Sequence, residues 1–277
     1  MAVTRFRHWP KGLATSGYSL ATLTPWIQSS PANRNVIWVD STSTATADGS
    51  FERPYTTLAA AVGDPDVVTN ESPIIVCKSS HAETLTAAVT KATTTGVTII
   101  GLGTGTSRPT FTVGGAVYGI DTTAAGSSWR FYNLRFASST AAASARIRIR
   151  GNGCLVKDCD FTFGTSDTAN PVGVSIESSF NRLEGCTFTA SGDATTRPGS
   201  AVAFGGSTFG NYLKDCTFDG GTYGWNGNAL TIGLTDLDWA IENITLKNGS
   251  LVANDQASYG WIAGVNSTGV VDISLRV

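Results

Sequence analysis

The stretch CLVKDCDF at residues 154–161 recurs as NRLEGCTF at 181–188 and as NYLKDCTF at 211–218. Each copy places a small turn residue just before a cysteine and a phenylalanine two residues after that cysteine. Cysteines at such a spacing suggest metal ligands, disulfide partners or plain core residues. The period of the repeat decides between these possibilities.

We take the turn residue before each cysteine as position zero, and the same pattern then extends well beyond the three copies. Position zero falls on Gly101, Asn133, Asp158, Gly185, Asp215, Asn243 and Asp272. Apolar residues recur at positions −2, +1 and +3, and the last two alternate as a β-strand requires. The change of phase at position zero needs a residue that tolerates left-handed backbone, which Gly, Asn and Asp do.

A second short strand precedes several units, for example in IRIRGNG at 147–153 and GVSIESS at 173–179. A repeat of about 30 residues with several short strands and no helical period indicates a parallel β-helix. Because parallel crossovers are nearly always right-handed, we predict an all-β, single-stranded, right-handed parallel β-helix.

We expect this domain over residues 35–277 and an extended arm over residues 1–34, where the repeat does not apply. A short helix is predicted at YTTLAAAV (55–62), with Thr56 or Thr57 as its N-cap. Such a helix would cover the open end of the coil, because terminal repeats need capping.

Residues at position −1 are predicted to point outward. They are Tyr132, Lys157, Glu184, Lys214 and Glu242. In stacked coils these side chains lie about 4.8 Å apart, so the last four form a ladder of alternating charge. At position +2 Arg135 would lie beneath Asp160.

The same register predicts that the cysteines point inward, because their counterparts in other repeats are Leu134, Ile244 and Ile273. A zinc site needs four converging ligands, and the chain has two histidines, His8 and His81. Stacked neighbours hold their Cβ atoms too far apart for a disulfide. We therefore interpret the cysteines as small core residues and predict no metal or cofactor.

Clustered carboxylates are the sharpest alternative, because polysaccharide lyases and hydrolases on β-helices use them with Ca²⁺ or as acid–base pairs. The candidates are Asp158, Asp160 and Glu184 on one outer face, and Asp236 with Asp238 in a turn. Lys157, Lys214 and Arg135 interleave with the first group, which favours a neutralised ladder. We predict no catalytic residue and no enzymatic activity.

Two Tyr-Gly-Trp motifs provide possible sugar-stacking aromatics. Their rings are Tyr223, Trp225, Tyr259 and Trp261. The alternatives are packing against a neighbouring subunit or filling a turn. A basic edge is expected from outward Arg146, Arg148 and Arg150, which suits an acidic partner or an ordinary solvated strand face.

Composition excludes some functions. With 19 basic and 21 acidic residues, the chain gives no reason to expect nucleic acid or an anionic membrane as partner. The opening MAVTRFRHWPKG is not followed by an apolar segment, so no secretory signal is expected. TIIGLGTGT (98–106) follows a strand but no helix pattern comes next, so we interpret it as a glycine-rich turn and not a nucleotide loop.

VIWVDSTSTATADGSFERPYTTLAAAV (36–62), HAETL (81–85) and GVTIIGLGTGTSRPTFTV (96–113) resemble phage-encoded right-handed β-helix proteins of the pectate-lyase-like superfamily. HWPKGLATSGY (8–18) is similar to the N-terminal arm of small proteins from the structural gene clusters of tailed phages. The resemblance implies a structural protein of the virion surface, made in the host cytoplasm. Its main implied function is to decorate and stabilise the capsid by docking on the major capsid protein, as a homotrimer.

The arm is the expected docking element, because Trp and Arg often dominate such contacts. Its candidate docking residues are Arg5, Arg7, His8, Trp9, Lys11 and Trp26. The alternative implied by the resemblance is a tailspike-like polysaccharide depolymerase or a non-catalytic adhesin that binds a host surface glycan. The sequence departs from depolymerase tailspikes in being short and in lacking an evident acid pair.

Overall fold

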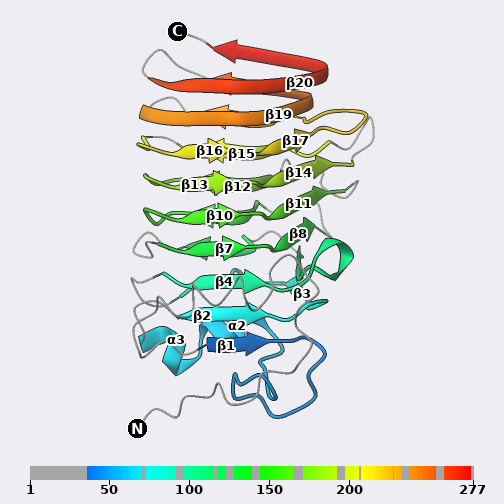
Figure 1. Cartoon of the computed structure of the whole chain (residues 1–277), viewed down its shortest axis with the longest axis vertical. Helices are drawn as coiled ribbons and strands as arrows, with labels where there is room; N and C mark the ends of the chain where they lie inside the picture. Colours follow the sequence, from blue (N-terminus) through cyan, green and yellow to red (C-terminus); the bar gives the residue numbers. More distant parts are fainter. Residues whose placement is uncertain are drawn as a thin grey trace.

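A computed structural model describes the chain over most of its length. The described residues are 36–69, 73–91, 96–114, 118–122, 128–138, 144–164, 171–191, 197–205, 207–226, 228–232, 237–253 and 259–275. The chain winds as a right-handed parallel β-helix, in which successive coils stack along one axis (Figure 1). The predicted fold class is confirmed. The predicted arm, with its six candidate docking residues, lies outside the described residues.

Three faces make up the coil. The first sheet contains β1 (Val36–Val39), β2 (Ile74–Cys77), β4 (Thr98–Gly101), β7 (Arg130–Tyr132), β10 (Leu155–Lys157), β13 (Arg182–Glu184) and β16 (Tyr212–Lys214). The second contains β3 (Ala82–Leu85), β5 (Thr110–Val113), β8 (Arg135–Ser138), β11 (Asp160–Phe163), β14 (Thr187–Ala190) and β17 (Thr217–Asp219). The third contains β6 (Ile120–Thr122), β9 (Ala145–Ile149), β12 (Val172–Ile176), β15 (Ser200–Phe204) and β18 (Leu230–Ile232). Two long strands, β19 (Leu237–Ala253) and β20 (Tyr259–Leu275), run around all three faces.

Columns of identical or similar side chains fill the interior. Phenylalanines of the second sheet stack with ring centroids 4.7 to 5.8 Å apart; they are Phe111, Phe136, Phe161, Phe188 and Phe218. All five rings are fully buried. The predicted column at position +3 is therefore the core of the molecule, because alternation turns every second side chain of a strand inward.

The bend between the first and second sheets is left-handed in five successive coils, as predicted for position zero. The residues are Asn133 (φ 55°), Asp158 (53°), Gly185 (62°), Asp215 (53°) and Asn243 (51°). Gly101 differs, because its φ is not left-handed. There a Cβ atom would lie 2.3 Å from the carbonyl oxygen of Asn133, so close backbone approach is what requires glycine.

The predicted register of the last repeat is wrong. Glu242 pairs with Ala263 and Ile244 with Val265, so the bend after Asn243 is Gly264, with φ 66°. Asp272, predicted at the bend, pairs instead with Ser250. The two bend residues are closer in sequence here, because β19 and β20 pass from face to face without the long connections of earlier coils. A search at the usual period of about 30 residues therefore places the last bend too late in the sequence.

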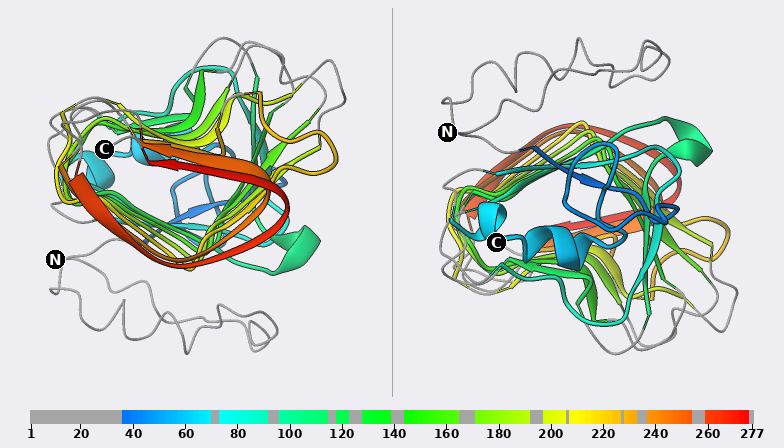
Figure 2. Two further views of the ribbon diagram at one scale, coloured as in Figure 1. Left: turned by 90° about the horizontal axis from the view of Figure 1, so that it is seen from above. Right: turned by 90° about the horizontal axis from the view of Figure 1, so that it is seen from below.

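Two short helices lie across the N-terminal end of the coil (Figure 2). The helix α2 (Leu58–Val62) begins at the predicted N-cap Thr57, whose side chain accepts a hydrogen bond from the amide of Ala60. The second helix, α3 (Pro65–Thr69), was not predicted. Buried apolar residues of both helices join the interior cluster, which confirms the predicted cap. No helix within the described ranges has the length and apolar character needed to cross a membrane.

A second apolar cluster lies on the outer face of the first strands. It comprises Trp38, Ile74, Val76, Ile100, Leu102 and Tyr132. The loop after β1 covers part of it, since Phe51 packs edge-on against Trp38 at 4.9 Å. The outer face of the first sheet is therefore apolar near α2 and charged further along the coil.

Candidate functional site

An open pocket lies at the bend between the first and second sheets. Its lining residues are Thr104, Arg108, Asn133, Asp158, Asp160, Gly185 and Thr187. We call it the bend pocket. Its floor is formed by the left-handed bend residues of adjacent coils. At Gly185, where φ is 62°, a Cβ atom would lie 2.5 Å from Oδ1 of Asp158, so a side chain there would displace the Asp158 carboxylate.

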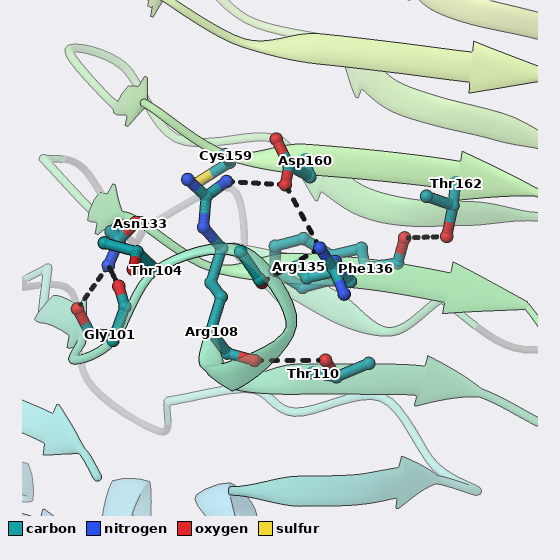
Figure 3. A network of polar contacts seen from close by, with 12 residues as sticks. Gly101, Thr104, Arg108, Thr110, Asn133, Arg135, Phe136, Cys159, Asp160 and Thr162 are labelled. Carbon is teal, nitrogen blue, oxygen red and sulfur yellow. Dashed lines mark hydrogen bonds and ion pairs between the residues drawn. The ribbon is translucent and has the colours of Figure 1, made fainter. Parts of the chain in front are cut away.

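One wall of the bend pocket comes from the glycine-rich segment. Nδ2 of buried Asn133 donates hydrogen bonds to the carbonyl oxygens of Gly101 and Gly103, at 2.8 and 2.9 Å (Figure 3). These bonds fix the chain as it enters the 3-10 helix η1 (Gly105–Ser107), which is followed directly by β5. As predicted, no α-helix follows the glycines, so the segment is a turn that positions Arg108.

Asp160 lies between two guanidinium groups (Figure 3). Its Oδ2 is 2.7 Å from Nη1 of Arg108 and 3.7 Å from Nη2 of Arg135. The pairing of β8 with β11 places Arg135 beside Asp160, as the sequence predicts. Arg108 was missed, because it lies in a turn that the repeat does not cover.

Both arginines have hydrogen-bonding capacity left. Nε of Arg108 and Nε of Arg135 are buried and have no hydrogen-bond partner in the structure. A buried donor without an acceptor costs free energy of about 1–3 kcal/mol. The bend pocket thus holds the guanidinium group of Arg108 beside the carboxylate of Asp160, with the hydroxyls of Thr104 and Thr187 on its walls. Arg135 approaches the same carboxylate from outside the pocket lining.

The charge ladder on the outer face of the first sheet is present as predicted. Nζ of Lys157 is 3.4 Å from Glu184, and Nζ of Lys214 is 3.3 Å from Glu242. Hydrogen bonds from Tyr212 and Lys214 hold the pKa of the Glu242 carboxyl below its usual value. Ion pairing therefore keeps this carboxylate charged. A catalytic acid requires the opposite shift.

Arginines of the third sheet do not form the predicted basic edge. Arg148 makes a bidentate pair with Glu177, and Arg150 one with Asp121, at shortest distances of 2.7 Å in each case. Arg146 does not point outward at all. It is fully buried, and its guanidinium lies 4.7 Å from the ring centre of Phe163. Strict alternation does not hold at the start of β9, where Ala145, Arg146 and Ile147 are all buried.

Of the four aromatics predicted to contact a glycan, Tyr223 and Trp261 are exposed, at 47% and 49%. The prediction that Trp225 contacts a glycan is wrong, because its side chain is 6% exposed and its ring packs edge-on against Phe163 at 5.1 Å. The side chain of Tyr259 lies outside the described residues. Two exposed rings were missed, Phe180 and Phe209, although each precedes an Asn-containing turn in the sequence.

Every cysteine of the chain is a buried free thiol, which confirms the interpretation as core residues. No group of three or more His, Cys, Asp or Glu side chains in the described part of the chain lies close enough to hold a metal ion. Cys154, outside the repeat column, belongs to a turn. Its amide donates to Oδ1 of Asn181 at 2.8 Å, and the amide of Asn181 donates to Oδ1 of Asn211 at 2.9 Å.

His81 and Glu83 join the first coil to α2. Nδ1 of His81 accepts a hydrogen bond from the amide of Ser41 at 2.9 Å, so Nε2 carries the proton toward Glu83, 3.3 Å away. The same carboxylate accepts from the amide of Leu58 at 2.7 Å. A carboxylate at a helix N-terminus is stabilising, and these buried groups are therefore structural.

Comparison with known proteins gives similarity of structure only. No protein-family model and no curated protein matches the chain. Among solved structures, the chain is similar to a pectin methylesterase from Aspergillus niger (TM-score 0.48, 12% identity, covering 89% of this chain and 86% of that one). A rhamnogalacturonan lyase gives a TM-score of 0.47 at 12% identity, covering 87% of this chain and 73% of its own. Pectate lyase Pel9A gives 0.40 at 13%, covering 90% and 80%.

Proposed function

We propose that this protein binds a neutral carbohydrate at the bend pocket and does not cleave it. The observation that carries the proposal is the unpartnered Nε–H donor of Arg108 beside the carboxylate of Asp160, both in the pocket lining. A sugar hydroxyl both accepts and donates hydrogen bonds. One hydroxyl can accept from a guanidinium while it, or its neighbour, donates to the carboxylate.

The charges of the pocket favour a neutral ligand over an anion. Asp158 and Asp160 would repel a phosphate or a uronate, and their two negative charges together balance the two guanidinium groups of Arg108 and Arg135. A polyol has no charge whose hydration must be removed when it enters the pocket. Its hydrogen bonds to the protein therefore need to replace only the hydrogen bonds that its hydroxyls made with water.

Binding without cleavage is supported by the state of the carboxylates. Glycoside hydrolysis uses two carboxyl groups, one of them held protonated by a raised pKa. In the bend pocket, Asp160 is instead ion-paired with Arg108 at 2.7 Å.

Isothermal titration against a panel of neutral mono- and oligosaccharides tests the proposal, with the best ligand then measured on two variants. Arg108→Gln removes a charged donor from the pocket, and we expect affinity to fall about tenfold or more. Lys247→Gln is the matched control, because it breaks the 2.9 Å pair with Asp219 outside the pocket and should bind like wild type. Unchanged binding by Arg108→Gln, or release of reducing ends that Asp160→Asn abolishes, would contradict the proposal.

Docking on a phage capsid stays a prediction from the resemblance, because the arm that carries it lies outside the described residues. The predicted trimer and virion location have the same basis. Deletion of residues 1–30 should abolish cosedimentation with capsids while leaving the melting temperature of the coil unchanged. Full cosedimentation of the truncated protein would show that the arm is not the anchor.

A further inference from the structure

Two aromatic residues lie in one column on the outer face of the first sheet: Tyr212, which is half-buried, and Trp261, which is exposed. Strand pairing places Arg182, Tyr212, Ala240 and Trp261 at the same position on four successive coils. Arg182 lies over the ring of Tyr212 at 5.3 Å, and Trp261 is 49% exposed. Ala240, which lies between Tyr212 and Trp261 in the column, contributes only a methyl group. Two coil spacings, about 10 Å, separate these rings.

Two more rings lie at the turn that leads into this column. Phe180, two residues before Arg182, is 56% exposed and packs edge-on against Phe209 at 5.4 Å. Phe180 has φ 60°, whereas the equivalent turn residues of neighbouring coils are Gly153 and Gly210. A bulky residue in left-handed backbone is strained, and exposing its ring to water adds a further cost. Strain kept at an exposed position is typical of functional sites.

Polar groups beside the rings are already satisfied by one another. Glu184 pairs with Lys157 and with Arg182, and Glu242 accepts from the hydroxyl of Tyr212 and pairs with Lys214. The surface therefore presents its rings in separate groups within a nearly neutral hydrogen-bonding frame, with Tyr212 and Trp261 in the column and the contacting pair Phe180 and Phe209 at the turn. A protein partner needs a continuous apolar centre, which separated rings do not provide. A sugar ring has an apolar face for an aromatic ring and hydroxyls around its edge, and so fits this pattern.

We propose that this column is a binding track for a linear neutral polysaccharide that lies along the coil axis. Tyr212 and Trp261 stack on sugar rings two units apart, and the intervening sugar unit lies over Ala240. Phe180 and Phe209 contact the polysaccharide at the turn. The repeat of the ligand matches the repeat of the coils, because one sugar unit adds a length similar to one coil spacing. The inference deepens the proposed function and rests on its carbohydrate ligand, but it uses a surface separate from the bend pocket.

Affinity electrophoresis with xylan, amylose and linear galactan, with polygalacturonate as the acidic comparison, identifies the retained probe. Titration with a length series cut from that probe then tests the track. Affinity should rise by about tenfold once the chain is long enough to reach both Tyr212 and Trp261, and Trp261→Ala should remove this gain while leaving the monosaccharide affinity unchanged. Tyr223→Ala, which removes an equally exposed ring elsewhere on the coil, is the control and should keep the gain.

Two further variants separate binding from folding. Ala240→Leu places a larger side chain between the two rings at an outward strand position, so it should remove the length-dependent gain without lowering the melting temperature. Phe180→Gly relieves the strained backbone and should keep or raise the melting temperature while weakening the long ligands. A length series with no gain, or a gain that survives both Trp261→Ala and Ala240→Leu, would overturn the track and leave the bend pocket standing. Failure of every sugar, short or long, to bind would overturn both proposals.

Discussion

At the scale of single residues, burial decides what the cysteines can do. Burial raises the pKa of the Cys159 thiol to about 12 and that of the Cys154 thiol to about 11. Burial and the neighbouring Cys216 also raise the pKa of Cys186. Since the thiolate is the reactive and metal-binding form, these side chains behave as small hydrophobic residues at neutral pH.

We therefore expect no cysteine of the native protein to react with Ellman's reagent at pH 8, and all of them to react in guanidinium. The raised pKa values also link stability to pH. Native thiols stay protonated, so their stabilising contribution is present below the unfolded pKa of about 8.5 and is lost as the pH rises toward their native values. Urea midpoints should accordingly fall above pH 9. Rapid reaction of one thiol before unfolding would contradict this description.

At the scale of elements, the sequence predicts the structure best where the same kind of side chain recurs at the same position in successive coils. The columns at positions −2, +1 and +3, the left-handed bends and the Lys157–Glu184 ladder all follow from alternation and from a fixed spacing. The cap helix was predictable because Thr57 starts it with an N-cap signal. Local rules suffice for these elements because each depends only on its own strand and on the strand above it.

Elements that break the period were not predictable in the same way. The last coil is shorter, so Gly264 and not Asp272 forms its bend. Arg108 lines the bend pocket and Phe180 lies beside the aromatic column of the first sheet. Both residues are in turns whose lengths vary from coil to coil. A turn residue acquires its partners only through the coil that stacks on it, and one sequence does not report that contact directly. The signals that did exist were weak: Phe180 and Phe209 each precede an asparagine by one or two residues.

At the scale of the whole molecule, each coil contacts mainly the coils beside it, so stability is carried by continuous columns through the stack. The phenylalanine column is the longest set of stacked rings among the described residues. Phe188 lies 4.7 Å from Phe161 and 5.1 Å from Phe218, with interplanar angles of 9° and 8°. Such offset stacks add about 0.5–1.5 kcal/mol per pair to the free energy gained from burying the rings.

Phe188→Asp should consequently destabilise the whole coil and not one turn of it. The substitution places an unpaired carboxylate between two buried rings, and we expect the free energy of unfolding to fall by several kcal/mol, or folding to fail. Thr162→Asp is the control, because it adds the same charge at an outward position of the neighbouring strand β11 and should cost less than about 1 kcal/mol. Chemical denaturation followed by circular dichroism gives both values. If Phe188→Asp unfolds at the same denaturant concentration as Thr162→Asp, the column does not hold the stack together, and stability must instead reside in the ladders of backbone hydrogen bonds between coils.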